Sequence, residues 1–223
     1  MGPSLQFRPI FAAWEALLGG AWLTLQLSLA CMVFGLVIGI ACAVAATFGG
    51  RRARGLVRLY VEAIRNTPFL IQLFLIFFGL PSLGVSLDPV AAALVGMSVN
   101  CGAYAAEIIR AGILAVPPGQ VEAARALALR TPQIVRHVVL FPALRQAAPA
   151  LGSQFVLVML GSSVVSTISA EELTARGHIL ETETFRPFEV YIVVAAIYLA
   201  LALALKTLFA GLEHRAAARG GRR

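Results

Sequence analysis

Charged residues are scarce in this sequence. Asp, Glu, Lys and Arg together make up 13% of its 223 residues, whereas soluble domains carry about 25%. Hydrophobic types account for 59% of the chain, so a soluble fold of this length would lack polar surface. The composition therefore excludes a soluble domain and predicts an integral membrane protein.

Lysine is nearly absent, and this excludes one kind of nucleotide site. A phosphate-binding P-loop needs a lysine between its last glycine and a Ser or Thr. The single lysine, Lys206, precedes Thr207 but follows Leu205 in an apolar run. The sequence also lacks the HExxH, CxxC and GxSxG motifs. We therefore expect no enzyme activity, no catalytic residue and no bound cofactor on this chain.

Cysteine is scarce too, and its spacing argues against a disulfide or a metal site. The three cysteines lie far apart in apolar runs without a nearby histidine, so we interpret them as packing thiols. They are Cys31, Cys42 and Cys101.

Long uncharged runs predict an all-α fold with five transmembrane helices. We expect these spans at about 21–48, 58–80, 89–110, 147–169 and 189–211, with a connecting loop over 111–145, all in one domain covering 1–223. Within the first span, Gly35 and Gly39 form a small-xxx-small pair, which is typical of close helix packing.

The basic residues orient these spans. Fifteen of the eighteen fall in alternate connections, so the positive-inside rule places the N-terminus outside and the C-terminus and the loop in the cytoplasm. The net charge of +7 then reflects topology and anionic headgroups rather than nucleic acid. The fifteen are Arg51, Arg52, Arg54, Arg58, Arg65, Arg110, Arg125, Arg130, Arg136, Arg145, Lys206, Arg215, Arg219, Arg222 and Arg223.

The cytoplasmic loop has the pattern of two short helices. We expect the first to begin at Gln120 behind Gly119 as its N-cap. The second is expected to begin behind Thr131 and to end at Pro142. An alanine-rich hairpin of this kind suits docking to a partner, although a hairpin lying on the bilayer fits the pattern as well.

Several motifs in order resemble one family. Glu122-Ala123-Ala124 resembles the EAA motif of the permease subunits of bacterial ABC importers. Other runs resemble the polar amino-acid uptake branch of that family, and the likeness covers Thr24 to about Leu212. These runs are Glu62-Ala63-Ile64-Arg65-Asn66-Thr67-Pro68 with Gln72, Tyr104 to Ile113, Val116 to Gln120, and Glu172-Leu173.

This resemblance implies a type I ABC importer permease in the bacterial inner membrane. A partner ATPase would hold ATP and Mg and would dock on the loop. A second permease subunit, either a copy or a relative, would complete the pathway. An extracytoplasmic binding protein would deliver a polar amino acid to the outer loops, around 84–88 and 171–188.

The chain departs from the family pattern at three places. Ala128 stands where the family usually has glycine, and a positive φ there would cost about 1 kcal/mol. The usual Leu-Pro pair reads Leu140-Phe141-Pro142. The frequent K-D-T-S-L run reads Leu160-Gly161-Ser162-Ser163-Val164, so its Lys-Asp charge pair is missing, and substrate details from other members do not carry over.

The motifs give candidate site residues for coupling and gating. We expect Glu122 and Arg125 to be polar contacts to the ATPase, or Glu122 to serve only the helix dipole. The close-packing face would be Ala123, Ala124 and Ala128. In each of two Glu–Arg pairs, the residues are three apart and can share a helix face. These pairs either brace the inner gate or the base of the loop, or only neutralise each other's charge at the membrane edge. These pairs are Glu62 with Arg65 and Glu107 with Arg110.

Polar side chains at membrane depth are candidates for the substrate pathway, because burying them in lipid without partners is costly. Hydrogen bonds between helices explain them equally well. Gly161 would allow local unwinding beside them. The candidates are Gln72, Asn100, Gln154, Ser162, Ser163 and Ser166.

Two rival functions remain open at this point. A self-contained facilitator or gradient-driven carrier would need intramembrane carboxylates for ion coupling, and none is predicted at mid-depth. A non-transport scaffold would show no substrate flux. Measuring substrate uptake with and without a coexpressed ATPase distinguishes these two functions from that of an ABC permease subunit.

Overall fold

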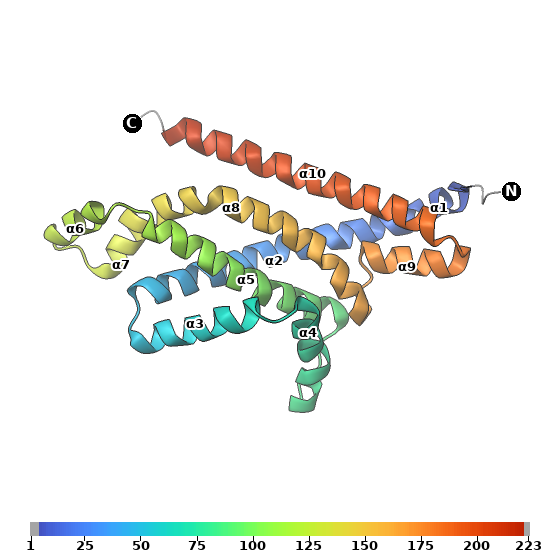
Figure 1. Ribbon diagram of the computed structural model, residues 1–223, viewed down its shortest axis with the longest axis horizontal. Coiled ribbons are helices and arrows are strands. Elements are labelled where there is room, and N and C mark those ends of the chain that lie inside the picture. Colours follow the sequence, from blue (N-terminus) through green and yellow to red (C-terminus); the bar gives the residue numbers. More distant parts are fainter. Residues whose placement is uncertain (1–4, 221–223) are drawn as a thin grey trace. The chain divides into compact units, whose positions relative to one another are not determined.

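The computed structural model describes the chain from Leu5 to Gly220, and its side chains as far as His214. Among the basic residues that predicted the topology, Arg222 and Arg223 lie outside the described residues. The side chains of Arg215 and Arg219 lie outside them as well. All regular elements within the described range are helical (Figure 1), which confirms the all-α class.

Four helical runs in the described part of the chain are long and apolar enough to cross a membrane. They are α2 (Trp14–Phe48), α5 (Pro89–Leu114), the run Thr131–Ile168, and α10 (Pro187–Gly220) as far as His214. A bent pair of helices, Arg51–Arg65 and Phe69–Leu83, raises the number of possible crossings to five if the pair counts as one span. The described residues thus hold four or five candidate spans, and the predicted five requires the bent pair to count as one. The orientation of the spans stays a prediction.

The bent pair corrects the second predicted span, 58–80, which is not one continuous helix. Helix α3 (Arg51–Arg65) ends shortly before Pro68, whose ring disfavours a helical conformation at Thr67. Side chains satisfy the last carbonyls, because Thr67 Oγ1 donates a hydrogen bond of 2.8 Å to the carbonyl of Ala63. A new helix, α4 (Phe69–Phe74), then begins and continues as irregular helix to Leu83.

The run Thr131–Ile168 shows that the predicted helix end at Pro142 is wrong. Helix α7 (Thr131–Ile134) passes through a π-helical turn, Val135–Val139, into α8 (Leu140–Gly161). Pro142 lies in the first turn of α8, just after this wide turn, where its missing N–H and its ring are accommodated. A 3₁₀ segment, Ser162–Ile168, completes the run.

The chain forms two compact units, and most of the long helices contribute to both. The first unit takes in the chain as far as Cys31, Phe69–Met97 and Val156–Leu205, and it contains α1 (Arg8–Ala12) and α9 (Leu173–Thr184). Its core brings the start of α2 together with α9 and the start of α10. The buried core residues are Ile10, Leu17, Ala21, Leu173, Leu180, Val190 and Val194.

The second unit comprises Met32–Pro68, Ser98–Phe155 and the chain from Lys206 onward. Here α2 and α5 approach so closely that a Cβ atom on Gly39 would lie 2.6 Å from Cβ of Ala105. A Cβ atom on Gly35 would lie 2.6 Å from Sγ of Cys101. The predicted small-xxx-small pair is therefore a close helix contact, as the spacing indicated.

Candidate functional site

Helix α6 (Pro118–Ala126) forms the tip of the predicted coupling loop. It begins two residues before the predicted Gln120, with Pro117 as its N-cap, so the assignment of Gly119 as the cap is wrong. Pro118 occupies the first helical position, where the missing N–H has no helical partner in any case. The prediction of Thr131 as the N-cap of the second helix is also wrong, because Arg130 is the N-cap and Thr131 is the first residue of α7.

The end of α6 contains a left-handed residue at the position where the family usually has glycine. Ala128 has a φ of 58°. The N–H of Leu129 donates to the carbonyl of Ala124 at 3.2 Å, and the N–H of Ala128 donates to that of Arg125 at 2.9 Å. These two bonds form a Schellman motif, whose left-handed position normally holds glycine. Backbone hydrogen bonds therefore form the bend after α6, and the alanine at its left-handed position is strained.

The exposed face of α6 differs from the predicted one at one position. Glu122, Ala123 and Arg125 are exposed, but Ala124 is only 4% exposed because it faces the interior of the loop. Its predicted place on a docking face is therefore corrected. Leu127, which sequence reasoning missed, is 76% exposed at the end of α6. Its place as a large apolar residue directly after a short alanine-rich helix is the sequence signal that could have identified it.

The two predicted Glu–Arg pairs behave differently. Arg110 holds Glu107 with two hydrogen bonds, from Nε to Oε1 and from Nη2 to Oε2, each 2.9 Å long. Arg65 also turns to Glu107, at 3.8 Å, and lies over the ring of Tyr104 at 5.3 Å. The Oε2 atom of Glu62 accepts a hydrogen bond of 3.0 Å from the side chain of Asn66 instead. The second unit thus joins Arg65, Glu107 and Arg110 in one cluster.

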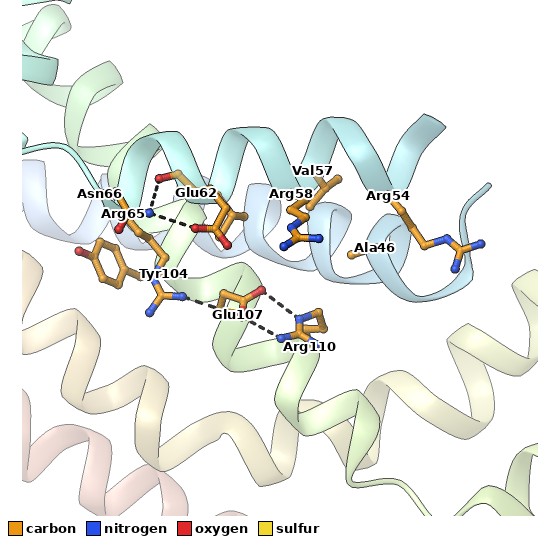
Figure 2. Close-up of a pocket in the computed structure, with 11 residues that line it drawn as sticks. Ala46, Arg54, Val57, Arg58, Glu62, Arg65, Asn66, Tyr104, Glu107 and Arg110 are labelled. Carbon is orange, nitrogen blue, oxygen red and sulfur yellow. Dashed lines mark hydrogen bonds and ion pairs between the residues drawn. The ribbon is translucent and has the colours of Figure 1, made fainter. Parts of the chain in front are cut away.

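This cluster forms part of the wall of a cavity of about 660 Å³ in the second unit. Figure 2 shows Arg54, Arg58 and Arg65 projecting from the same side of α3 toward α5, which carries Glu107 and Arg110. The cavity wall carries four guanidinium groups and two carboxylates, so it is formally positive.

The structure places the candidate pathway residues in both units. Three of the hydroxyls donate to carbonyls of their own helix: Ser162 to Met159 at 2.7 Å, Ser163 to Leu160 at 3.0 Å and Ser166 to Ser163 at 2.7 Å. Ser162 is 0% exposed and Gln72 is 7% exposed, while Asn100 and Gln154 are half-buried. The helix tightens to 3₁₀ directly after Gly161 rather than unwinding there, so local unwinding stays a prediction.

Glu172 has a structural role that sequence reasoning missed. Its carboxylate is 0% exposed and caps α9, with Oε1 accepting hydrogen bonds from the N–H groups of Thr174 and Ala175 at 2.8 and 3.1 Å. The hydroxyl of Thr24 donates to Oε2 at 3.2 Å and accepts from the N–H of Leu173. The Glu-Leu motif marked this position, but only the fold brings Thr24 to it.

A second cavity, of about 610 Å³, lies in the first unit. It is lined by the 3₁₀ segment, including Ser166, by Glu171 in the segment before α9, and by α9, including His178. Beside it, Glu181 accepts hydrogen bonds from Tyr191 at 2.8 Å and from His178 at 3.2 Å. The hydrogen bond from Tyr191, and then that from His178, lower the pKa of Glu181. This cavity brings hydroxyl, carboxylate and imidazole groups together.

Known proteins are similar to this chain in sequence and in fold. The family model described as binding-protein-dependent transport system inner membrane component matches residues 35–218. A glutamine transport system permease of Escherichia coli is 37% identical over 209 residues, which cover 92% of this chain and 95% of the relative. An L-cystine transport system permease of Bacillus subtilis is 36% identical, covering 83% of this chain and 80% of the relative. A crystal structure of an amino acid ABC transporter with histidines matches with a TM-score of 0.86 and 34% identity, covering 96% of this chain and all of the other.

Proposed function

Because this chain belongs to the family of binding-protein-dependent transport system inner membrane components, we propose that it carries a polar amino acid into the cell through a pathway that it shares with a second permease subunit. It is a multi-pass inner-membrane permease subunit of an ABC amino-acid importer. An ATPase subunit and a substrate-binding protein are its partners. ATP and Mg would bind on the ATPase.

The geometry of α6 supports coupling at this helix. Its exposed Glu122 and Arg125 are charged groups that an ATPase surface can pair with. Leu127 adds an exposed apolar anchor at 76%, and anchors of this kind bind by filling a pocket on the partner. The Schellman bonds at Ala128 fix the bend after these residues, so a displacement of α6 passes to α7 as a rigid-body motion.

The substrate proposal comes from the relatives. They are described as carrying glutamine and L-cystine, both amino acids with polar side chains. Amide and hydroxyl groups can hold the ammonium and carboxylate of such a molecule without a fixed charge. We therefore keep Gln72, Asn100 and Gln154, together with the serines after Gly161, as the proposed pathway groups.

Copurification tests the coupling proposal. The substitution Glu122→Lys should release the coexpressed ATPase from the detergent-solubilised chain, because it reverses a charge at the contact. Glu183→Lys is the matched control, since Glu183 is an exposed helical glutamate in the first unit, and it should retain the ATPase. Full retention by Glu122→Lys at normal yield would contradict docking at this residue.

A further inference from the structure

We propose that the cavity between α3 and α5 binds the phosphate of an anionic phospholipid. The cavity holds about 660 Å³ and lies wholly within the second unit. Its wall carries four guanidinium groups against two carboxylates. A site with this excess of positive charge selects an anion.

The charges that line the cavity are only partly matched. Glu107 is held by Arg110 at 2.9 Å and approached by Arg65 at 3.8 Å. Among the residues that the structure describes, Arg54 and Arg58 have no ion-pair partner. They therefore carry the positive charge that remains for a ligand.

Arg54 and Arg58 are placed to hold one oxyanion together. They lie four residues apart on α3, so their side chains share one helix face, and both line the cavity (Figure 2). Like charges at this spacing repel each other unless an anion lies between them. The planar fork of a guanidinium matches phosphate oxygens in pairs. The geometry therefore favours a phosphate between the two arginines.

The rest of α3 indicates that this phosphate belongs to a lipid. Leu56 and Leu59 project from another side of the helix and are 69% and 67% exposed, which suits contact with acyl chains. Helix α3 begins three residues after the apolar α2 ends, so its arginines stand where a membrane-crossing helix reaches the headgroups. An amino acid with equal positive and negative charge gains less from such a cavity than an anionic lipid does.

Native mass spectrometry of the detergent-solubilised chain tests this site directly. The probes are phosphatidylglycerol and phosphatidylcholine, added singly at moderate salt so that long-range attraction is screened. Arg54→Gln/Arg58→Gln should weaken binding of phosphatidylglycerol roughly thirty-fold, since each arginine near an anionic lipid contributes about fivefold. Arg58→Lys, which keeps the charge but loses the fork, should show an intermediate loss.

Arg51→Gln/Arg52→Gln is the matched control. It removes two charges from the same helix, but Arg51 and Arg52 are exposed and do not line the cavity, so it should weaken binding less than about threefold at this salt. Equal losses in the two double variants would overturn the site in favour of general surface attraction. Equal binding of phosphatidylcholine would overturn it too. Displacement of the lipid by free glycerol phosphate would show that the ligand is a soluble oxyanion. None of these results depends on transport, so the proposed function stands or falls separately.

Discussion

The hydroxyl of Tyr198 donates a hydrogen bond of 2.5 Å to Oε2 of Glu172, a carboxylate that is 0% exposed. Thr24 donates to the same oxygen, so the carboxylate receives side-chain hydrogen bonds from α2 and α10 while it caps α9. A buried carboxylate is tolerated only when its oxygens are satisfied in this way. This contact therefore joins three helices of the first unit.

Removing the Tyr198 hydroxyl should destabilise the protein. Tyr198→Phe leaves a buried carboxylate with one donor fewer, and hydrogen bonds to charged groups contribute about 1.5–3 kcal/mol. The expected result is a lower midpoint of thermal unfolding in detergent. Tyr191→Phe is the control on the same helix, because the hydroxyl of Tyr191 donates to Glu181 in an exposed hydrogen bond. An equal shift in both variants would contradict the role of Glu172.

Glycine at position 128 should stabilise the coupling loop. Ala128→Gly removes a Cβ atom from a residue with a φ of 58°, a gain of about 1 kcal/mol. The control Ala126→Gly lies within α6, where glycine should cost about 1 kcal/mol. Hydrogen exchange of the α6 amides measures both, with slower exchange expected for the first variant and faster exchange for the second. Faster exchange in Ala128→Gly would show that the alanine is not strained.

The close contact between α2 and α5 gives a third prediction. Gly39→Val places a side chain where even a Cβ atom would lie 2.6 Å from Ala105, and overpacking of this kind costs about 1–3 kcal/mol. Gly55→Ala is the control, since a Cβ atom there meets nothing within 4 Å. The folded fraction after detergent extraction should fall for Gly39→Val only. Normal yield and unfolding midpoint for that variant would contradict the contact.

The ion-pair cluster is predicted to affect transport more than stability. Glu107→Gln removes the charge that Arg65 and Arg110 approach, and such half-exposed pairs contribute less than about 1 kcal/mol. If the cluster braces the gate or the loop, ATP-driven uptake should fall while the thermal midpoint barely moves. Glu62→Gln is the control, because its partner is Asn66. Unchanged uptake in Glu107→Gln would contradict the bracing role and indicate that the cluster only neutralises charges at the membrane edge.

Features governed by local chemistry could be predicted from the sequence. The apolar runs predicted the helical class, and four of the five predicted spans are single helical runs in the described residues, since burial in lipid requires such runs. Ala128 in place of the usual glycine raised the possibility of a left-handed residue, and its φ is 58°. Gly35 and Gly39 indicated close packing of two helices, although not the identity of the partner helix.

Features that depend on distant residues or on several competing local preferences could not be predicted. Thr24 and Glu172 are 148 residues apart, and no periodicity links them. Pro142 has a strong tendency to end a helix, but the π-helical turn before it accommodates the ring. Arg65 has a glutamate at helical spacing on its own helix, yet it turns to Glu107, because packing between helices decides between two available carboxylates.

Uptake into proteoliposomes tests the central claim most directly. The chain would be reconstituted with its ATPase and substrate-binding protein, with labelled glutamine and L-cystine supplied on the side of the binding protein. Accumulation should require ATP on the opposite side, and Glu122→Lys should abolish it. Accumulation that persists without ATP or without the ATPase would contradict the account and identify the chain as a carrier that works alone.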